Sequence, residues 1–273
     1  MFAAELQAAA ELAREAGRIV SHVYATDFAV HSKGAAGPVT EADKAANAYL
    51  VEALRMRFPG DGVVAEESVE CGDALHKGRC WYVDPLDGTK EFVAKNGEFS
   101  VMVGLAVDGR AKVGAVYQPV TDKLYLGAEG EGAKLVQAGT TRALQVSTEA
   151  SPSALRLVVS RSHRSAATSA VVKHLGLTEE RQSGSVGLKI GLIAEQVADL
   201  YVHLSEHACL WDACAPEAIL HAAGGRLTDL YGDAITYRGP DMKNRHGLLA
   251  CNAAAFDAVL PHVTAVAADV LPR

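Results

Sequence analysis

The chain has 273 residues, of which 49% are hydrophobic and 22% are charged, and this balance excludes a disordered chain. Its formal net charge of -7 argues against a nucleic-acid groove built on bulk positive charge. A small anionic substrate is still allowed, because a few local cations or metal ions can hold one phosphate. We therefore expect a globular protein of one large or two modest domains, with no nucleic-acid polymer as partner.

The cysteines and the N-terminal stretch indicate a cytoplasmic chain. The five cysteines are scattered and form no CxxC pair, which disfavours a zinc ribbon or a disulfide framework and fits a reducing compartment. Glu5, Glu11 and Glu15 interrupt the apolar N-terminal stretch, so we expect an amphipathic helix there rather than a secretory segment. No run of about 18 uncharged apolar residues occurs, so we expect no membrane span.

The first part of the chain predicts two helices and two short strands. Apolar residues recur at helical spacing over about residues 3–25, a loop follows over 32–40, and Thr40 is placed to cap a second helix that Pro59 and Gly60 end. The apolar stretches "GVVAEES" and "CWYVD" then read as short strands that finish in acids. Residues 87–89 read as a turn into a short helix.

The predicted secondary structure changes character twice in the remaining chain. Residues 99–128 are β-rich with turn residues between the runs, which predicts an antiparallel meander, and the glycine-rich "GAEGEGAK" reads as a hairpin turn rather than a P-loop. After about residue 145, helical and strand patterns alternate, which predicts an α/β half. We therefore expect an N-terminal α+β domain over 1–145 with most metal ligands, and a C-terminal α/β domain over 146–273 with Asp212 and the substrate-binding residues.

Carboxylates stand at the ends of predicted elements in four stretches: "VTEADKAAN", "VVAEES", "VDPLDGT" and "LWDACAP". In "DPLDGT", Pro85 biases Asp84 toward an extended conformation, and the chain then turns sharply. Two carboxylates so close repel each other unless a cation lies between them, and oxygen ligands favour Mg²⁺, Mn²⁺ or Ca²⁺. Gly88 and Thr89 open a helix whose free N–H groups can receive a phosphate. The stretch alone reads equally well as a capped turn; the four together indicate metal-assisted phosphoryl hydrolysis.

The four stretches resemble the signature motifs of the inositol monophosphatase superfamily. "DPLDGTKEF" is followed, 125 residues after Asp87, by "WDACAPEAIL", and "PVTEAD" and "EES" match the other two acidic positions in order. The resemblance covers nearly the whole chain. It implies an α+β fold, the layered α-β-α-β-α sandwich of the inositol monophosphatase and fructose-1,6-bisphosphatase type. It also implies lithium-sensitive, Mg²⁺-dependent hydrolysis of a small-molecule phosphate monoester, and homodimers are common in the superfamily.

The resemblance also implies a metal site. One Mg²⁺ ion would be held by Glu66, Asp84 and the backbone carbonyl of Leu86, and a second ion by Asp84, Asp87 and Asp212. Asp43 would lie outside this set or bind a weaker third ion through water. Thr89, oriented near Glu66, would position the attacking water, and no covalent enzyme intermediate is expected. The backbone N–H groups of Gly88 and Thr89 would grip the scissile phosphate.

The form "DGTKEF" is similar to the branch of 3'(2'),5'-bisphosphate nucleotidases, which convert adenosine 3',5'-bisphosphate to AMP. "NGEFSV", "VVSRSH" and "GSVGLKIGLIAE" agree with that branch. A second phosphate needs cations, and Arg161, His163 and Lys189 are the candidates; each of them could equally be ordinary surface charge. Lys90 either aids substrate choice or is a solvated residue of the first helical turn. In the cell, such an enzyme would remove the by-product of sulfate activation.

Three other readings stay open from the sequence. An inositol or sugar phosphatase would use the same metal site, and a non-catalytic phospholigand-binding protein would keep the acids without turnover. The stretch from His203 to His207 matches the zinc pattern H-x-x-E-H, which needs a helix to bring both histidines to one face. The β-like "ADLYVHL" before it argues against that helix, so we expect a loop or the rim of the substrate site.

Overall fold

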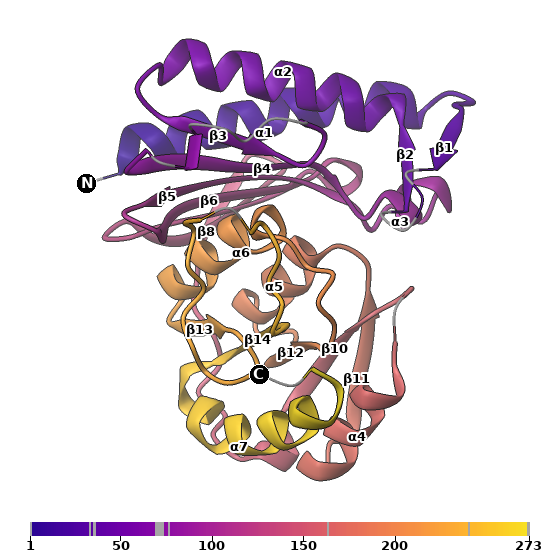
Figure 1. The fold of residues 1–273 in the computed structure, drawn as a ribbon, viewed down its shortest axis with the longest axis vertical. Helices are drawn as coiled ribbons and strands as arrows, with labels where there is room; N and C mark the ends of the chain where they lie inside the picture. The colour runs from indigo at the N-terminus through magenta and orange to yellow at the C-terminus, as the bar shows by residue number, and fades with distance from the viewer. Residues whose placement is uncertain are drawn as a thin grey trace.

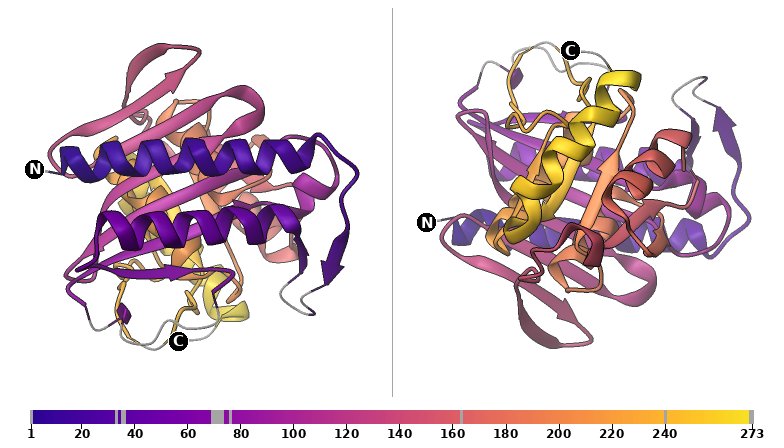
Figure 2. Two further views of the ribbon diagram at one scale, coloured as in Figure 1. Left: turned by 90° about the horizontal axis from the view of Figure 1, so that it is seen from above. Right: turned by 90° about the horizontal axis from the view of Figure 1, so that it is seen from below.

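The computed structural model describes residues 2–32, 34, 37–68, 74–75, 77–162, 164–239 and 241–271. Its helices and sheets lie in five layers (Figure 1). Two long helices, α1 (Ala3–Tyr24) and α2 (Glu41–Arg57), cover one face of a seven-stranded sheet. Seen from above, they lie side by side across that sheet (Figure 2). Leu12, Leu50 and Trp81 are fully buried in the core that the two helices and this face share.

The middle layer consists of α5 (Val186–Ala194) and α6 (Leu210–Ala222), which pack between the two sheets. A five-stranded sheet follows, and α4 (Ala166–Leu175) and α7 (Ala253–Val270) cover its far side. This layered α-β-α-β-α arrangement confirms the predicted α+β fold class.

The seven-stranded sheet has the order β3-β4-β5-β6-β7-β8-β9. Only β3 and β4 are parallel, and every other neighbouring pair is antiparallel. The predicted meander is therefore confirmed, with two strands more than expected after the turn at Glu129–Glu131. The strands are β3 (Gly62–Ala65), β4 (Arg79–Asp87), β5 (Ser100–Val107), β6 (Arg110–Gln118), β7 (Lys123–Ala128), β8 (Gly132–Gln137) and β9 (Thr140–Leu144).

The five-stranded sheet has the order β11-β10-β12-β14-β13, with parallel pairs β10–β11 and β10–β12. Its two edge strands were not expected from the sequence. β11 has four exposed residues out of five, because an edge strand in this position has little apolar surface to bury, and its sequence "EERQS" carries no strand pattern. The strands are β10 (Arg156–Ser160), β11 (Glu179–Ser183), β12 (Leu200–His203), β13 (Gly225–Thr228) and β14 (Leu248–Asn252).

Two local expectations need correction. The segment 32–40 is not all loop, because β1 (Val30–Ser32) and β2 (Pro38–Thr40) pair as an antiparallel hairpin. Asp84 does not end its strand, since β4 continues to Asp87 with an irregular register between them. Helix α6 begins at Leu210, so Asp212 lies inside its first turn. The short helices are α3 (Thr89–Val93), η3 (Pro119–Thr121) and η4 (Pro152–Ala154).

Helix α7 is the one helix of the described residues that could cross a membrane by length and composition. Its apolar residues Phe256, Val259 and Val263 are buried against the second sheet, as in the core helix of a folded domain. Core helices of folded domains often have this length and apolar composition, so these two properties are weak evidence for a membrane span. Figure 2 shows the helix lying across the sheet when the molecule is seen from below.

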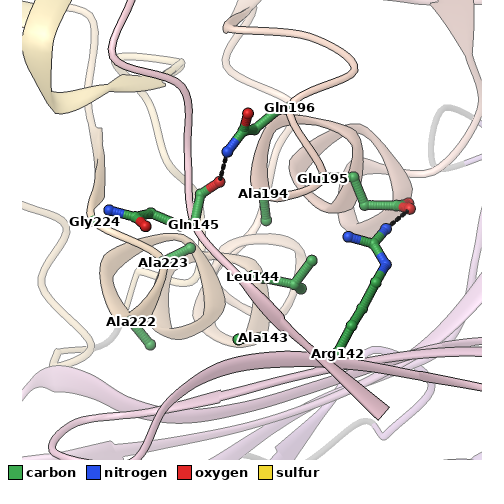
Figure 3. A pocket seen from close by; sticks show the side chains of 10 residues that line it. All are labelled: Arg142, Ala143, Leu144, Gln145, Ala194, Glu195, Gln196, Ala222, Ala223 and Gly224. Carbon is green, nitrogen blue, oxygen red and sulfur yellow. Dashed lines mark hydrogen bonds and ion pairs between the residues drawn. The ribbon is translucent and has the colours of Figure 1, made fainter. Parts of the chain in front are cut away.

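A cavity of about 680 Å³ lies between β9 and the C-terminal ends of α5 and α6 (Figure 3). Three of its polar side chains, those of Arg142, Glu195 and Gln196, form hydrogen bonds. Glu195 accepts hydrogen bonds from Arg142 and Lys123, and the Gln196 side chain donates to the carbonyl of Gln145. The cavity lies near residue 145, where the sequence predicted a domain boundary. That boundary stays a prediction. None of the predicted site residues lines this cavity.

The buried acid Glu217 on α6 makes folding stability depend on pH. Its carboxylate accepts a hydrogen bond of 2.5 Å from the Tyr237 hydroxyl, and burial raises the pKa of Glu217 to about 7. A folded-state pKa above the unfolded value stabilises the fold at pH below the unfolded value, and this contribution is lost as pH rises through about 7. Since one pKa unit corresponds to about 1.4 kcal/mol, the loss is about 3 kcal/mol at most.

We therefore expect Glu217→Gln to flatten the decline of stability between pH 5 and pH 8.5. The free energy of unfolding, measured by urea denaturation at several pH values, should fall less steeply for the variant than for the wild type. Other acids contribute to both proteins, so the difference between the two curves isolates Glu217. Parallel curves would show that Glu217 does not titrate in this range.

Candidate active site

The acidic turn is built at the end of β4. Asp84 is 2% exposed and pairs across the sheet with Met102, whereas Asp87 pairs with Ser100 after an irregularity in the register. The N–H group of Leu86 donates to Oδ1 of Asp84 over 2.9 Å. The short kink around Pro85 thus places two carboxylates within one turn at the strand end, as the sequence predicted.

Acids from three separate segments converge here. Burial raises the pKa of Asp84, and the negative charges of Glu66, Asp87 and Asp212 raise it further. Burial and the charge of Asp87 likewise raise the pKa of Asp212, which reaches the site from the first turn of α6. Each of these carboxylates therefore lies close enough to its neighbours to oppose their ionisation. Burial raises the pKa of Asp87, whereas the positive charge of Lys189 lowers it.

The donor set suits a divalent cation. Burial and the neighbouring negative charges raise the pKa of both Asp84 and Asp212. A cation between the carboxylates would offset this repulsion, and carboxylate oxygens are the ligands that Mg²⁺ prefers. Among the described residues, no three histidine, cysteine, aspartate or glutamate side chains already surround one point as ligands. One carboxylate oxygen of Asp87, Oδ2, accepts from the Ser185 hydroxyl and from the N–H of Gly187.

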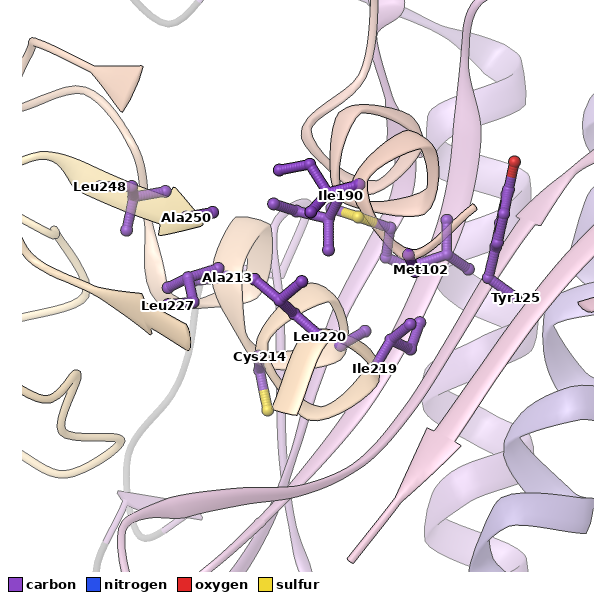
Figure 4. Packing of buried hydrophobic residues seen from close by; sticks show 14 of the residues in the cluster. Met102, Tyr125, Ile190, Ala213, Cys214, Ile219, Leu220, Leu227, Leu248 and Ala250 are labelled. Carbon is purple, nitrogen blue, oxygen red and sulfur yellow. The ribbon is translucent and has the colours of Figure 1, made fainter. Parts of the chain in front are cut away.

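A track of three glycines positions α6, and with it Asp212. Gly104, Gly114 and Gly127 lie opposite one another on β5, β6 and β7, so they share one face of the sheet. A Cβ atom on Gly114 would lie 2.1 Å from the carbonyl oxygen of Ala215. The backbone of α6 thus rests directly on the backbone of the sheet. Figure 4 shows this helix in the apolar layer beside the sheet, with Ala213, Cys214, Ile219 and Leu220.

Asp43 and Thr89 form a hydrogen-bonded pair next to the acids. The Thr89 hydroxyl donates to Oδ1 of Asp43 over 3.0 Å and lies 3.2 Å from the carbonyl oxygen of Leu86. The other carboxylate oxygen of Asp43 accepts from the N–H and the hydroxyl of Thr40, each over 2.7 Å, which completes the cap of α2. The predicted cap is confirmed. Asp43 is fully buried and accepts the hydrogen bond that orients Thr89, and the predicted position of Thr89 near Glu66 stays a prediction.

The turn after Asp87 is fixed by Gly88. Its φ of 94° lies in the left-handed region that favours glycine, and it precedes the first residue of α3. A Cβ atom there would lie 3.1 Å from the carbonyl oxygen of Glu98. Lys90 is exposed in the first turn of α3. The predicted turn and short helix are confirmed, while the phosphate contacts of Gly88, Thr89 and Lys90 stay predictions.

Arg161 and Lys189, two of the cations expected to bind a second phosphate, differ in their partners and in their burial. Arg161 is held by Glu98 through two hydrogen bonds of 2.6 and 2.7 Å. Lys189 is 3% exposed, and its Nζ lies 5.1 Å from the centre of the Tyr201 ring. Burial lowers the pKa of Lys189, while the charges of Asp87 and neighbouring glutamates raise it. His163 lies outside the described residues.

Sequence reasoning missed several residues of this site. Ser185 donates to Asp87 over 2.5 Å and caps α5 by accepting from the N–H of Leu188. Glu91 is 5% exposed and accepts a hydrogen bond from the Ser162 hydroxyl. A serine placed before an apolar helical run was a signal for the cap. Nothing local to the sequence indicated the contact to Asp87, which is 98 residues away.

The H-x-x-E-H stretch does not form the helix that a zinc site of this type requires. His203 ends β12, and residues 204–208 form a loop before α6. The His203 ring contacts the hydroxyls of Tyr201 and Ser205 at 3.3 and 2.8 Å, whereas His207 is exposed. The two histidines therefore do not share a helix face, in agreement with the expected loop.

The fold and the acidic turn agree with a comparison to known families. Residues 3–267 match the model of the inositol monophosphatase family. The chain belongs to the inositol monophosphatase family. The resemblance that the four acidic stretches predicted is thereby confirmed.

Relatives within the inositol monophosphatase family are similar over most of the chain. The 3'(2'),5'-bisphosphate nucleotidase CysQ of Escherichia coli O157:H7 is 38% identical over 83% of this chain and 91% of its own length. The crystal structure of CysQ from Bacteroides thetaiotaomicron has a TM-score of 0.78 at 28% identity and covers 93% of this chain and 98% of its own. Inositol monophosphatase from Anabaena (Nostoc) sp. PCC 7120 has a TM-score of 0.77 at 28% identity and covers 96% of both chains.

Proposed function

We propose that this chain is a cytoplasmic, Mg²⁺-dependent 3'(2'),5'-bisphosphate nucleotidase that converts adenosine 3',5'-bisphosphate to AMP and phosphate. The observation that carries the proposal is the convergence of Glu66, Asp84, Asp87 and Asp212 beside the Gly88 turn. Similarity to proteins named 3'(2'),5'-bisphosphate nucleotidase supports the choice of substrate. Removal of a by-product of sulfate activation, lithium sensitivity and a homodimeric state belong to the same proposal.

The proposal assigns two or three Mg²⁺ ions to this site. Glu66, Asp84 and the Leu86 carbonyl would hold one ion, and Asp84, Asp87 and Asp212 a second. Asp43 would bind a third only through water, since both its oxygens already accept hydrogen bonds from Thr40 and Thr89. Bound Mg²⁺ supplies acidified water and neutralises charge on the phosphoryl group.

The residues of the chain position the reactants. The Thr89 hydroxyl donates a hydrogen bond to Asp43. The lone pairs of the Thr89 oxygen therefore stay free to accept a hydrogen bond from the attacking water. Asp43, held by the cap of α2, fixes that orientation. The N–H groups of Gly88 and Thr89 would hold the scissile phosphate in line with this water. Attack of this water would form the new bond to phosphorus and break the bond to the 3'-oxygen, which would take up the proton that the water loses and leave as the hydroxyl of AMP.

The first test measures phosphate release with Mg²⁺ from adenosine 3',5'-bisphosphate, inositol 1-phosphate and fructose 1,6-bisphosphate. We expect a strong preference for the nucleotide and loss of release in Asp87→Asn, because that change removes a metal ligand and keeps the side-chain shape. A preference for inositol phosphate would retain the mechanism and overturn the substrate. Metal and ligand binding without turnover would favour a non-catalytic phospholigand-binding protein.

A second candidate function is hydrolysis of an inositol or sugar phosphate at the same acids. The burial of Lys189 and the pairing of Arg161 with Glu98 favour it, because neither cation is free for a second phosphate in this arrangement. The substrate panel separates the two functions directly.

A further inference from the structure

Glu98 holds Arg161, one of the cations predicted to bind a second phosphate. Its two carboxylate oxygens accept from Nη2 and Nε of Arg161 over 2.6 and 2.7 Å, which is a bidentate pair. One of these oxygens also accepts from the N–H of Gly184 over 2.8 Å. Partial burial opposes ionisation, but the hydrogen bonds from Arg161 and Gly184 outweigh it and lower the pKa of Glu98. Glu98 is therefore a carboxylate at neutral pH.

The pair lies against the turn that would hold the scissile phosphate. A Cβ atom on Gly88 would lie 3.1 Å from the carbonyl oxygen of Glu98, and a Cβ atom on Gly184 would lie 2.3 Å from the same oxygen. The backbone at Glu98 thus runs between the Gly88 turn and the segment leading into α5. Arg161 reaches this place from the loop after β10, in the other half of the chain. A ligand that extends from the turn toward Arg161 must pass Glu98.

The local charges are already balanced without a second phosphate. Arg161 is neutralised by Glu98, and Lys189 lies in the field of Asp87, Glu91 and Glu98. Metal ions would compensate the aspartates but not these two glutamates. An added phosphate dianion would be repelled unless Glu98 released Arg161. A group with less charge than a carboxylate could not compete for the same guanidinium.

We propose that Glu98 is a specificity-determining residue, whose carboxylate occupies Arg161 until the second phosphate of a substrate displaces it. The inference rests on the proposed bisphosphate substrate. Only a substrate that uses Arg161 must break this pair, so Glu98 weakens the binding of a bisphosphate by the strength of the pair and leaves the binding of a monophosphate unchanged. Glu98 thereby sets, and lowers, the preference for a bisphosphate over a monophosphate.

The test compares adenosine 3',5'-bisphosphate with adenosine 3'-monophosphate, which lacks only the second phosphate. With Glu98→Gln, we expect the KM for the bisphosphate to fall about two- to five-fold, the effect of an exposed ion pair, with kcat unchanged. The KM for the monophosphate should stay the same. In an Arg161→Gln background, which itself raises the KM for the bisphosphate, Glu98→Gln should have no further effect.

Glu180→Gln is a matched control. Glu180 forms a bidentate pair with Arg164 at 2.8 and 2.9 Å, with similar exposure of both side chains, but it lies on β11. We expect no change in either KM. If Glu98→Gln instead raises KM or lowers kcat equally for both nucleotides, Glu98 and Arg161 only fasten the two loops and the inference is wrong.

Failure of the proposed function is distinguishable from failure of this inference. If the wild type hydrolyses neither nucleotide, the proposed function is wrong. Glu98 is then tested by calorimetric titration of the Mg²⁺-loaded protein with adenosine 3',5'-bisphosphate. Tighter binding by Glu98→Gln than by the wild type would support the inference, and equal or weaker binding would overturn it.

Discussion

Replacing Asp84 by asparagine is expected to lower Mg²⁺-dependent phosphate release by more than about 100-fold. Asp84 is the carboxylate that the other three acids all influence, and both proposed ions use it. Loss of a residue that only orients a metal ligand typically costs about 10- to 100-fold, so loss of a direct ligand should cost more. Asparagine keeps an oxygen that can accept from the N–H of Leu86, and the turn should therefore persist.

The same substitution should stabilise the protein when no divalent ion is present. Asp84 is buried among like charges, and removing one of them relieves repulsion that folding otherwise has to overcome. For a chain of this size, about 1 kcal/mol corresponds to a rise of about 2–4 °C in Tm. Thermal unfolding with and without Mg²⁺ measures both effects: the metal-free Tm should rise, and the increase on adding Mg²⁺ should disappear.

Asp257→Asn is the control for this experiment. Asp257 is exposed and pairs with Arg226 at the surface, so its replacement should change neither activity nor the response to Mg²⁺. An Asp84→Asn variant that keeps its Mg²⁺-dependent rise in Tm would show that the ions bind elsewhere.

Replacing Gly114 by alanine is expected to affect both stability and metal binding. The added Cβ would lie 2.1 Å from the carbonyl oxygen of Ala215, and a backbone atom cannot rotate away as a side chain could. Overpacking of a core typically costs about 1–3 kcal/mol, and a clash with helix backbone should be at the upper end. Helix α6 must then move off the sheet, and Asp212 in its first turn moves with it.

Two measurements separate these effects. The free energy of unfolding should fall, and the Mg²⁺ concentration that gives half-maximal phosphate release should rise. Gly60→Ala is the matched control, because Gly60 has open space around its Cβ position and no positive φ. A large loss of stability with an unchanged Mg²⁺ requirement would mean that α6 yields locally, without displacing Asp212.

Local signals in the sequence predicted the parts of the site that are contiguous in the chain. Thr40 caps α2 as predicted, and Asp43, three residues later, completes the cap. The stretch "DPLDGT" contains its own turn, because proline fixes the backbone angle φ and glycine allows a positive φ. The long helices and the antiparallel meander were equally predictable, since their apolar residues repeat with the period of the element. Edge strand β11 was missed because its exposed residues lack any such repeat.

The partners of the charged side chains could not be predicted in this way. From the sequence, Arg161 and Lys189 could equally be cations that bind a phosphate or ordinary surface charge. In the fold, Arg161 meets Glu98, 63 residues away, and Lys189 is buried near Asp87. A charge is free or neutralised according to which segments pack against it, and sequence spacing does not contain that information.

The sequence by itself therefore determined the fold class, the family and the acids of the site, because each depends on residue type and on short-range order along the chain. The tertiary structure alone decided how those acids are held. Ser185 orients Asp87 across 98 residues, and three glycines on adjacent strands set how closely α6 approaches the sheet. The physical reason is that hydrogen bonds and close packing act between atoms that folding brings together, whatever their separation in the sequence.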